Sequence, residues 1–276
     1  MPFRVEPAVS FRERLASARS LSPVEGRPLV GAWICSGSPI AAEIVAGSGL
    51  DWTLIDGEHS PLGLTEIVAL LQAVAAYPIT PVVRVPSADP VWIKQVLDTG
   101  AQNLLVPMVN SAEDAAAAVA ATRYPPRGIR GVGSALARAG QFNRIEDYLQ
   151  RAHEITSLSV QIETDAAVRN ARAIAEVDGV DAVFIGPSDL AASMGLLGQQ
   201  EHPDVVAAVE HTIAEVRAAG KPVGVNAFNP ATARRYIDAG ASFALVAADV
   251  SILARATEKL AADWIPDADQ AERAGY

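Results

Sequence analysis

The chain has 276 residues, half of them hydrophobic, and a formal net charge of −10. This length suits one (β/α)₈ barrel, and the acidic balance without any lysine- or arginine-rich run argues against nucleic acid and anionic membrane as partners. The single cysteine, Cys35, excludes an intrachain disulfide framework. The chain carries no apolar run long enough to span a bilayer and no secretory signal, so we expect a soluble cytoplasmic protein.

Residues 1–28 form an N-terminal lead-in, in which Phe11 to Arg19 predicts a short amphipathic helix. Eight short apolar runs follow, each too short for a helix and bounded by turn residues, which is typical of buried strands. These runs are Leu29–Ile34, Trp52–Asp56, Pro81–Val85, Asn103–Pro107, Leu158–Glu163, Ala182–Ile185, Pro222–Asn226 and Phe243–Val246.

Helical patterns lie between most of the runs. Asp89-Pro90 predicts a helix start that ends at Gly100, and the segment from Ser111 to Asp114 resembles a capping box with Asp in place of Glu or Gln. Strand–helix alternation repeated eight times favours a closed parallel TIM barrel over an open sheet. The longest gap, between runs four and five, predicts one helix and then the loop Tyr124–Asn143.

These patterns predict a single barrel domain over residues 29–265. The segment that follows, residues 266–276, is polar and lacks periodicity, so we expect a mobile tail.

In a barrel, catalytic side chains lie at the carboxyl ends of the strands and in the loops that follow. The second run ends at Asp56 and is followed by His59, the third contains Arg84, and the fifth ends at Glu163. The sixth is followed by Asp189. We therefore expect an imidazole, a guanidinium and several carboxylates to converge on one mouth of the barrel.

Glu163 and Asp189 follow adjacent strands, and two such carboxylates can share a hard divalent cation. Without a cation they would repel each other, and one would be driven to bind a proton. The alternative interpretation is that each carboxylate only caps a helix start. Spacing alone leaves these two interpretations about even.

Arg84 and His59 each allow a structural and a functional interpretation. A guanidinium at the end of an apolar strand either forms an internal salt bridge or stabilises a developing oxyanion. His59 is either a hydrogen-bonded structural histidine or a general base.

The three lysines, Lys94, Lys221 and Lys259, lie in helices or at the opposite end of the barrel. None is placed to form a Schiff base with a carbonyl substrate. Gly131-Val-Gly133 superficially fits a dinucleotide-binding pattern, but it does not follow a strand.

Seven segments, in this order, resemble the HpcH/HpaI aldolase family, and the likeness extends from about residue 29 to about residue 262. They are Asp56-Gly-Glu-His59, Pro81-Val-Val-Arg84, Ile93-Lys-Gln-Val-Leu-Asp98, Leu105-Val-Pro-Met108, the run from Arg123 to Arg138, Gln161-Ile-Glu-Thr164 and Phe184-Ile-Gly-Pro-Ser-Asp-Leu190.

The resemblance implies a class II pyruvate aldolase, which reversibly cleaves 4-hydroxy-2-oxoacids into pyruvate and a small aldehyde in the breakdown of aromatic compounds. It implies that Glu163 and Asp189 ligate Mg²⁺, Mn²⁺ or Co²⁺, which pyruvate chelates. Gln161, Gly186 and Ser188, together with Asp189, would hold the substrate.

The resemblance also assigns the proton chemistry. Arg84 would stabilise the enolate oxygen, and His59 would transfer protons, with Asp56 in the same segment. Asp98 of a neighbouring subunit would make the histidine more basic. The family assembles as homohexamers with an exchanged C-terminal helix, expected here over Ser251–Ala262.

Ser188 replaces the alanine that relatives often have, and the segment Gly224–Pro230 also departs from the family pattern, which leaves the aldehyde open. Two alternatives remain: an acyl-CoA lyase of the citrate lyase β or malyl-CoA type, and a non-catalytic barrel that binds pyruvate or sugar acids.

Overall fold

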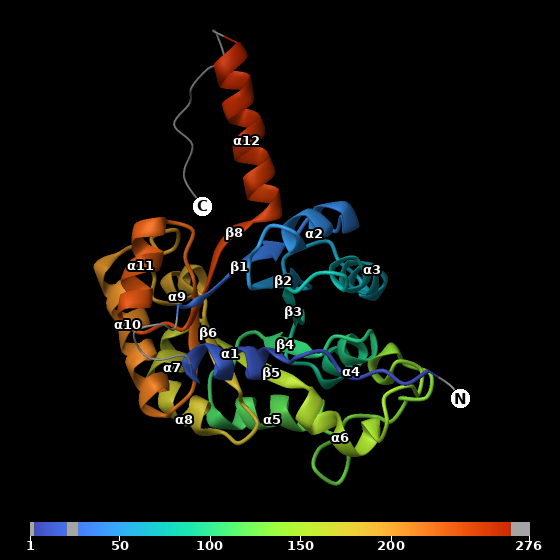
Figure 1. Ribbon diagram of the computed structural model, residues 1–276. Coiled ribbons are helices and arrows are strands. Elements are labelled where there is room, and N and C mark those ends of the chain that lie inside the picture. Colours follow the sequence, from blue (N-terminus) through green and yellow to red (C-terminus); the bar gives the residue numbers. More distant parts are fainter. Residues whose placement is uncertain (1–2, 21–26, 266–276) are drawn as a thin grey trace.

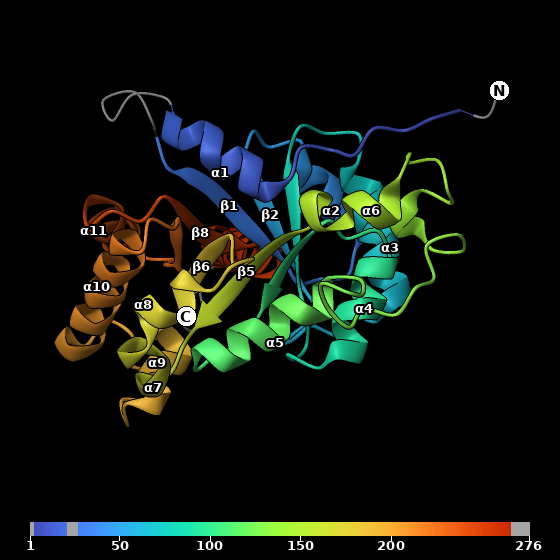
Figure 2. The same cartoon turned by 90° about the horizontal axis from the view of Figure 1, so that it is seen from below.

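The computed structural model describes residues 3–20 and 27–265, so the predicted tail lies outside the described residues. Eight parallel strands close into a barrel in sequence order (Figures 1 and 2). The strands are β1 (Leu29–Ile34), β2 (Trp52–Asp56), β3 (Thr80–Arg84), β4 (Asn103–Val106), β5 (Ser157–Ile162), β6 (Ala182–Ile185), β7 (Val223–Asn226) and β8 (Phe243–Ala248). The predicted TIM barrel is confirmed, and each strand agrees with its predicted run to within about two residues.

Helices follow the strands and surround the barrel, as Figure 2 shows most clearly for α4, α5 and α8. The helices are α1 (Phe11–Ser20), α2 (Pro39–Ala46), α3 (Leu64–Val74), α4 (Pro90–Asp98), α5 (Ala112–Thr122), α6 (Tyr148–Ile155), α7 (Asp165–Arg169), α8 (Ala171–Glu176), α9 (Pro187–Ser193), α10 (Pro203–Ala218), α11 (Pro230–Asp238) and α12 (Asp249–Trp264). A short 3₁₀ turn, η1 (Arg138–Gly140), lies between α5 and α6.

The prediction of one helix and a loop between β4 and β5 was incomplete, because α6 also lies there. Tyr148 and Ala152 of this helix are buried against Tyr124 and Ile145 in a small separate cluster. The helix is only 8 residues long, so much of its stability must come from this tertiary packing, which sequence periodicity does not reveal.

The predicted helix starts are confirmed by their caps. The Asp89 side chain accepts a hydrogen bond from the Val91 N–H, and Pro90 occupies the first helical position. Ser111 accepts from the Asp114 N–H. The Asp114 carboxylate accepts from the N–H of Asn110 rather than from that of Ser111, because the shorter Asp side chain reaches a different donor.

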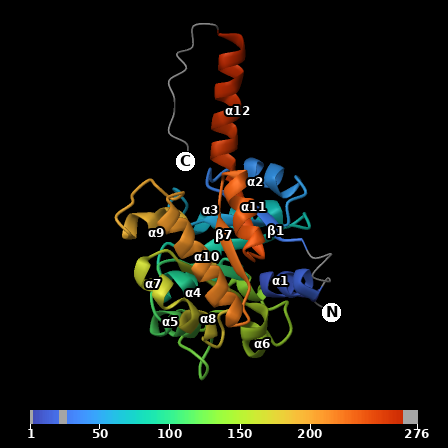
Figure 3. The same cartoon turned by 90° about the vertical axis from the view of Figure 1, so that its left-hand side faces the viewer.

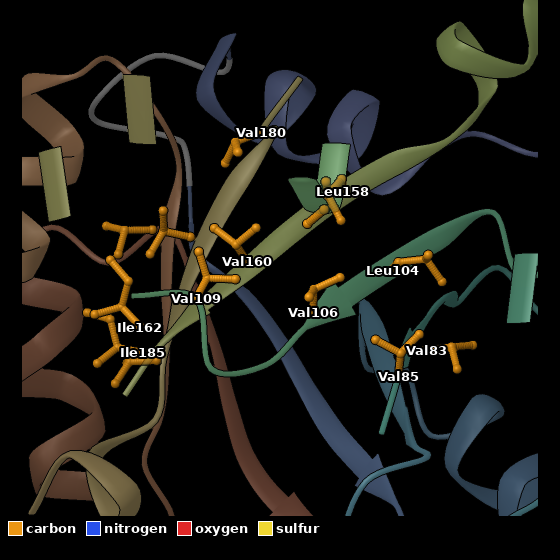
Figure 4. Close-up of a cluster of buried hydrophobic side chains, with 14 of the residues drawn as sticks. Val83, Val85, Leu104, Val106, Val109, Leu158, Val160, Ile162, Val180 and Ile185 are labelled. Atoms are coloured by element: carbon orange, nitrogen blue, oxygen red, sulfur yellow. The ribbon is translucent and has the colours of Figure 1, made fainter. Parts of the chain in front are cut away.

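Alternate residues of each strand enter two different cores. Val83 belongs to the layer between strands and helices, which Figure 4 shows with other aliphatic side chains of β3 to β6. Its neighbour Val82 belongs to the barrel interior. This period of two is the geometry of a strand covered on both faces.

Aromatic side chains fill the lower barrel interior. The rings of Trp52, Phe184 and Phe243 contact one another, and Phe11 of α1 packs against Trp52 and Phe243 at centroid distances of 5.1 and 5.3 Å. A side chain at Gly224 would place its Cβ 2.1 Å from the Phe243 ring. The expected N-terminal helix therefore closes the base of the barrel.

The last helix, α12, projects away from the barrel (Figures 1 and 3). Asp249 is its buried residue, whereas Val250, Leu253, Leu260 and Trp264 are exposed apolar side chains. The observed bounds enclose the range expected for the exchanged helix. Within the described residues, no helix combines the length and apolarity that crossing a membrane requires.

Candidate active site

The mouth at the carboxyl ends of the strands encloses a cavity of about 150 Å³. Its lining combines apolar, polar and charged side chains from β1, β3, β5, β6 and β7, from the segments that follow β2 and β6, and from the first turn of α9. The lining residues are Trp33, His59, Arg84, Gln161, Phe184, Gly186, Ser188, Asp189 and Asn226. Six of the predicted site residues are therefore brought together here.

Arg84 ends β3 and is almost completely buried, with 5% of its side chain exposed. Its Nε donates to Asp56 Oδ1 at 2.8 Å, and its Nη1 lies 2.8 Å from Glu58 Oε2. The guanidinium carbon lies 4.4 Å from the centroid of a Trp33 ring. The internal salt bridge is thus present, and the same guanidinium also lines the cavity.

Asp56 holds Arg84 from the neighbouring strand, because these two residues are paired in the β2–β3 register. Burial raises the pKa of the Asp56 carboxyl, but the hydrogen bond and charge of Arg84 outweigh it and leave that pKa below its usual value. Asp56 is therefore ionised and fixes the guanidinium in one orientation.

Glu163 directly follows β5 and is 2% exposed. Its Oε1 accepts the Met108 N–H at 2.7 Å, and its Oε2 accepts from the side-chain amide of Gln161. Burial raises the pKa of Glu163 to about 7, opposed by the Met108 N–H and increased further by the charges of Glu58 and Asp189. This carboxyl lacks a direct cationic partner among the described residues.

Two further carboxylates lie at the cavity or next to it: Asp189 lines it, and Glu58 contacts Arg84, which also lines it. Burial raises the pKa of Glu58, and the charges of Asp56 and Asp189 add to this effect although Arg84 and His59 oppose it. Asp189 lies in the first turn of α9 rather than at the strand end and is exposed. The charge of Asp189 also raises the pKa of Glu163, so these two predicted ligands act on each other as like charges.

This environment fits a hard divalent cation. Glu163 and Asp189 offer oxygen donors, and the buried Oε1 atom of Gln161 has no hydrogen-bond partner. A Cβ at Gly186 would lie 2.9 Å from Glu163 Oε2, so the glycine leaves the carboxylate accessible. The described residues contain no group of three or more acidic, His or Cys side chains arranged around one point, so water or substrate must complete any coordination.

His59 lies at the rim with 65% of its side chain exposed, and its Nε2 is 3.9 Å from Glu58 Oε2. Asp98 is absent from the cavity lining. It lies at the end of α4, where its Oδ1 accepts from Nη2 of the fully buried Arg130 at 2.7 Å. Within one protomer the structure does not bring Asp98 to His59.

The three lysines are also absent from the cavity lining. Lys221 donates to the Val180 carbonyl at 2.6 Å, and Lys259 pairs with Asp263 along α12. Cys35, beside the mouth, is partly buried, and burial raises the pKa of its thiol to about 11. The thiol is accordingly protonated near neutral pH.

Residues 29–256 match the sequence family of HpcH/HpaI aldolases and citrate lyases, which covers most of the chain. A curated relative in Salmonella dublin, 4-hydroxy-2-oxo-heptane-1,7-dioate aldolase, is 54% identical over 237 residues, spanning 86% of this chain and 90% of the relative. The chain belongs to the HpcH/HpaI aldolase/citrate lyase family.

Solved structures of the HpcH/HpaI family share the fold. A family protein from Burkholderia cenocepacia J2315 is 41% identical, with a TM-score of 0.84 over 90% of this chain and 98% of that protein. An HpcH/HpaI aldolase from Desulfitobacterium hafniense DCB-2 is 28% identical, with a TM-score of 0.82 over 96% of this chain and 100% of that protein.

Sequence reasoning missed three side chains of this HpcH/HpaI site. Glu58 lies in the segment Asp56-Gly-Glu-His59, but no role was predicted for it. Its position between Asp56 and His59 could have identified it as a residue of the site. Trp33 and Asn226 come from β1 and β7, where Trp33 Nε1 donates to Asn226 Oδ1 at 2.9 Å. Only closure of the barrel brings those two strands close enough for this contact.

Proposed function

We propose that this protein is a class II pyruvate aldolase, which reversibly cleaves 4-hydroxy-2-oxoacids to pyruvate and an aldehyde such as succinic semialdehyde. The observation that carries the proposal is the buried carboxylate of Glu163 beside the cavity at the mouth. It accepts a hydrogen bond from Gln161, which lines that cavity together with Arg84 and Asp189, although Glu163 is not itself among the lining residues. Membership in the aldolase family and the 54% identity to a hydroxy-oxoacid aldolase support the same chemistry.

Glu163 and Asp189 are proposed to hold Mg²⁺, Mn²⁺ or Co²⁺. When bound, the cation supplies positive charge that polarises the keto group of pyruvate. The carboxylates of the site offset that charge, and Met108 fixes the orientation of Glu163 by donating its N–H. Gly186 leaves room at the Glu163 oxygen for an approaching ligand.

Arg84 is proposed to stabilise the oxyanion that forms when pyruvate loses a methyl proton. The carboxylates of Asp56 and Glu58 hold its guanidinium from one side, and the Trp33 ring covers one face of that guanidinium. A donor held in place before the reaction stabilises developing charge without reorganisation during it.

His59 is proposed to transfer protons at the aldehyde oxygen. Its exposure at the rim allows it to meet the substrate and solvent, and Glu58 lies near its Nε2. In the cleavage direction the imidazole accepts the proton of the 4-hydroxyl, and in the condensation direction it returns that proton to the new alkoxide.

Gln161, Gly186 and Ser188 are proposed to position the substrate. Gln161 Oε1 has no hydrogen-bond partner within the described residues. Because buried polar atoms are normally paired, a hydrogen-bond donor or a cation of the bound ligand would complete this site. Ser188 lies in the first turn of α9, where backbone N–H groups have no partner within the helix and can face a carboxylate.

The assembly is proposed to be a homohexamer in which α12 is exchanged between protomers. The exposed apolar side chains of α12 support this, since a helix with an apolar face requires a packing partner. Asp98 would then assist His59 of a neighbouring subunit, with Arg130 positioning its carboxylate.

Chelation tests the proposal directly. Pyruvate release from a 4-hydroxy-2-oxoacid should disappear in thoroughly chelated protein and return when Mg²⁺, Mn²⁺ or Co²⁺ is added. Full activity in the metal-stripped protein would refute the cation's role. Turnover of malyl-CoA in preference to hydroxy-oxoacids would instead place the protein among the acyl-CoA lyases.

A further inference from the structure

The loop of residues 107–110, which follows β4, contains a strained residue beside Glu163. Met108 has a φ of 57°, in the left-handed region that residues other than glycine rarely adopt. Its N–H donates to Glu163 Oε1 at 2.7 Å. An unfavourable backbone conformation persists only where the surrounding contacts hold it, so this loop must be restrained by its neighbours.

The side chain of Asn110 supplies a restraint on Met108. Its Nδ2 donates to the Met108 carbonyl oxygen at 2.9 Å, and its Oδ1 accepts from the Thr164 hydroxyl. Thr164 directly follows Glu163 in the chain. The Asn110 amide therefore connects the residue that donates to Glu163 with the residue that follows it, and these contacts close a ring that includes the Glu163 carboxylate.

Asn110 is itself held by its backbone. Its N–H donates to Asp114 Oδ2 at 3.0 Å, and its carbonyl oxygen accepts from Asn170 Nδ2 at 2.8 Å. The opposite orientation of the Asn110 amide would place its oxygen against the Met108 carbonyl oxygen, where neither atom can donate. The amide nitrogen is therefore directed at Met108.

A backbone contact and apolar packing tie the same loop to β5. The Val109 N–H donates to the Gln161 carbonyl oxygen at 3.2 Å, and Val109 is 1% exposed. Its side chain belongs to the same core cluster as Val160 of β5, near which Figure 4 shows it. Packing thus keeps the loop against β5, while the hydrogen bond from Asn110 fixes how the backbone turns at Met108.

We propose that Asn110 is a positioning residue for the cation site, which holds Met108 in the conformation from which its N–H orients the Glu163 carboxylate. This inference rests on the proposed aldolase function, in which Glu163 is a metal ligand. Groups that orient a metal ligand raise the affinity of the site, because a ligand that is already in place loses less conformational freedom on binding.

Titration of metal-stripped protein with Mn²⁺, followed by electron paramagnetic resonance of the free ion, tests this role without measuring activity. Asn110→Ala removes both side-chain hydrogen bonds and should weaken Mn²⁺ binding about 2- to 10-fold, the range that the net loss of one hydrogen bond implies. The Mn²⁺ concentration that gives half-maximal pyruvate release should rise by a similar factor.

Two variants of Thr164 test the other side of the ring and serve as the test if Asn110→Ala folds poorly. Thr164→Ser keeps the hydroxyl that donates to Asn110 and accepts the Ala167 N–H, so it should bind Mn²⁺ as the wild type does. Thr164→Val removes the hydroxyl and should weaken binding. The double variant Asn110→Ala/Thr164→Val should lose less than the product of the two single effects, because both changes break one shared contact.

Ser111→Ala is the matched control. It removes the neighbouring N-cap hydrogen bond, which Ser111 accepts from the Asp114 N–H, and leaves the side-chain contacts of Asn110 in place. Mn²⁺ binding should then stay at the wild-type level. An equal weakening in Ser111→Ala would overturn the positioning role, because it would trace the effect to a general loosening of the loop.

The same titration separates this inference from the aldolase proposal. If the wild type binds Mn²⁺ and both Asn110→Ala and Thr164→Val bind it equally well, the positioning role is wrong and the metal-dependent aldolase stands. If the wild type itself binds no Mn²⁺, both proposals are overturned.

Discussion

The two ends of the barrel are built from the same strands but differ completely in chemistry. On β2 the inward positions run from Trp52 through Leu54 to Asp56, and on β3 from Val82 to Arg84. Every second residue points inward, so each of these two strands contributes apolar side chains at the base and a charged one at the mouth.

The difference between the two ends shows how the barrel can bury charged groups, which is energetically unfavourable. At the base, aromatic side chains pack against one another and against α1 and exclude water. At the mouth, carboxylates are buried although burial raises the pKa of Glu58 and Glu163. The close packing of the base holds the strands in register. The carboxylates at the mouth, which repel one another, are thereby kept at fixed positions.

Replacement of the rim histidine should give the largest effect. His59→Ala is expected to slow cleavage of a 4-hydroxy-2-oxoacid about 10²- to 10⁴-fold, because it removes the proposed proton carrier. Pyruvate methyl exchange should fall less if solvent can remove the methyl proton. His211→Ala, on the exposed side of α10, is the control. Equal loss of both activities would mean that His59 also handles the methyl proton.

Replacement of the buried guanidinium should affect both activities together. Arg84→Ala is expected to reduce cleavage and methyl exchange each about 10²- to 10³-fold, because the enolate oxygen forms in both reactions. NMR detection of deuterium uptake measures the exchange. Wild-type exchange in Arg84→Ala would show that the role assigned to Arg84 is wrong, and Arg235→Ala controls for loss of an exposed arginine.

A change at the base should affect stability rather than chemistry. Phe11→Ala removes a ring that is 1% exposed and should destabilise the protein by about 3–5 kcal/mol. Denaturant unfolding measures this change, and activity of the folded fraction at low temperature should be retained. Phe3→Ala, at a side chain that is 80% exposed, should leave stability unchanged. A loss of activity in fully folded Phe11→Ala would mean that the two ends are not separable.

The pH dependence of the metal-stripped protein gives the smallest effect. The pKa of Glu163 in the folded state is about 7, above its usual value of 4.5. Between pH 4.5 and 7 the folded state therefore binds more protons at this carboxyl than the unfolded state does. Stability should therefore decrease as pH rises from 4.5 to 7, by at most about 1.4 kcal/mol per unit. Glu163→Gln should flatten this dependence in urea unfolding, and an unchanged slope would contradict the raised pKa.

Much of the architecture could be predicted because it follows from local patterns. Apolar runs bounded by turn residues located the strands, and closure of the barrel then placed Arg84 and Asp189 at one mouth. Glu163 could be singled out by its place directly after β5, whereas Asp98, at the end of α4, could be singled out only through the family resemblance. Their roles remain predictions.

The features that escaped prediction depend on contacts between distant segments. The direction of the Glu58 side chain depends on where Arg84 lies on the next strand. Contact between Trp33 and Asn226 joins β1 to β7, which are 193 residues apart at this point. The stability of α6 depends on Tyr124 and Ile145. No periodicity within one segment encodes these relations.

The first residue of α12 connects the outside of the protein to its mouth. Asp249 accepts the N–H groups of Cys35 and Ser36 at 2.9 and 3.1 Å, immediately after the strand that carries Trp33. A force that reorients α12, such as its capture by another protomer, acts through this carboxylate on the ring that covers Arg84. If α12 is exchanged between protomers as proposed, we expect protein concentration to set how firmly the guanidinium is held, and a dilute protomer and an assembled one to differ in turnover.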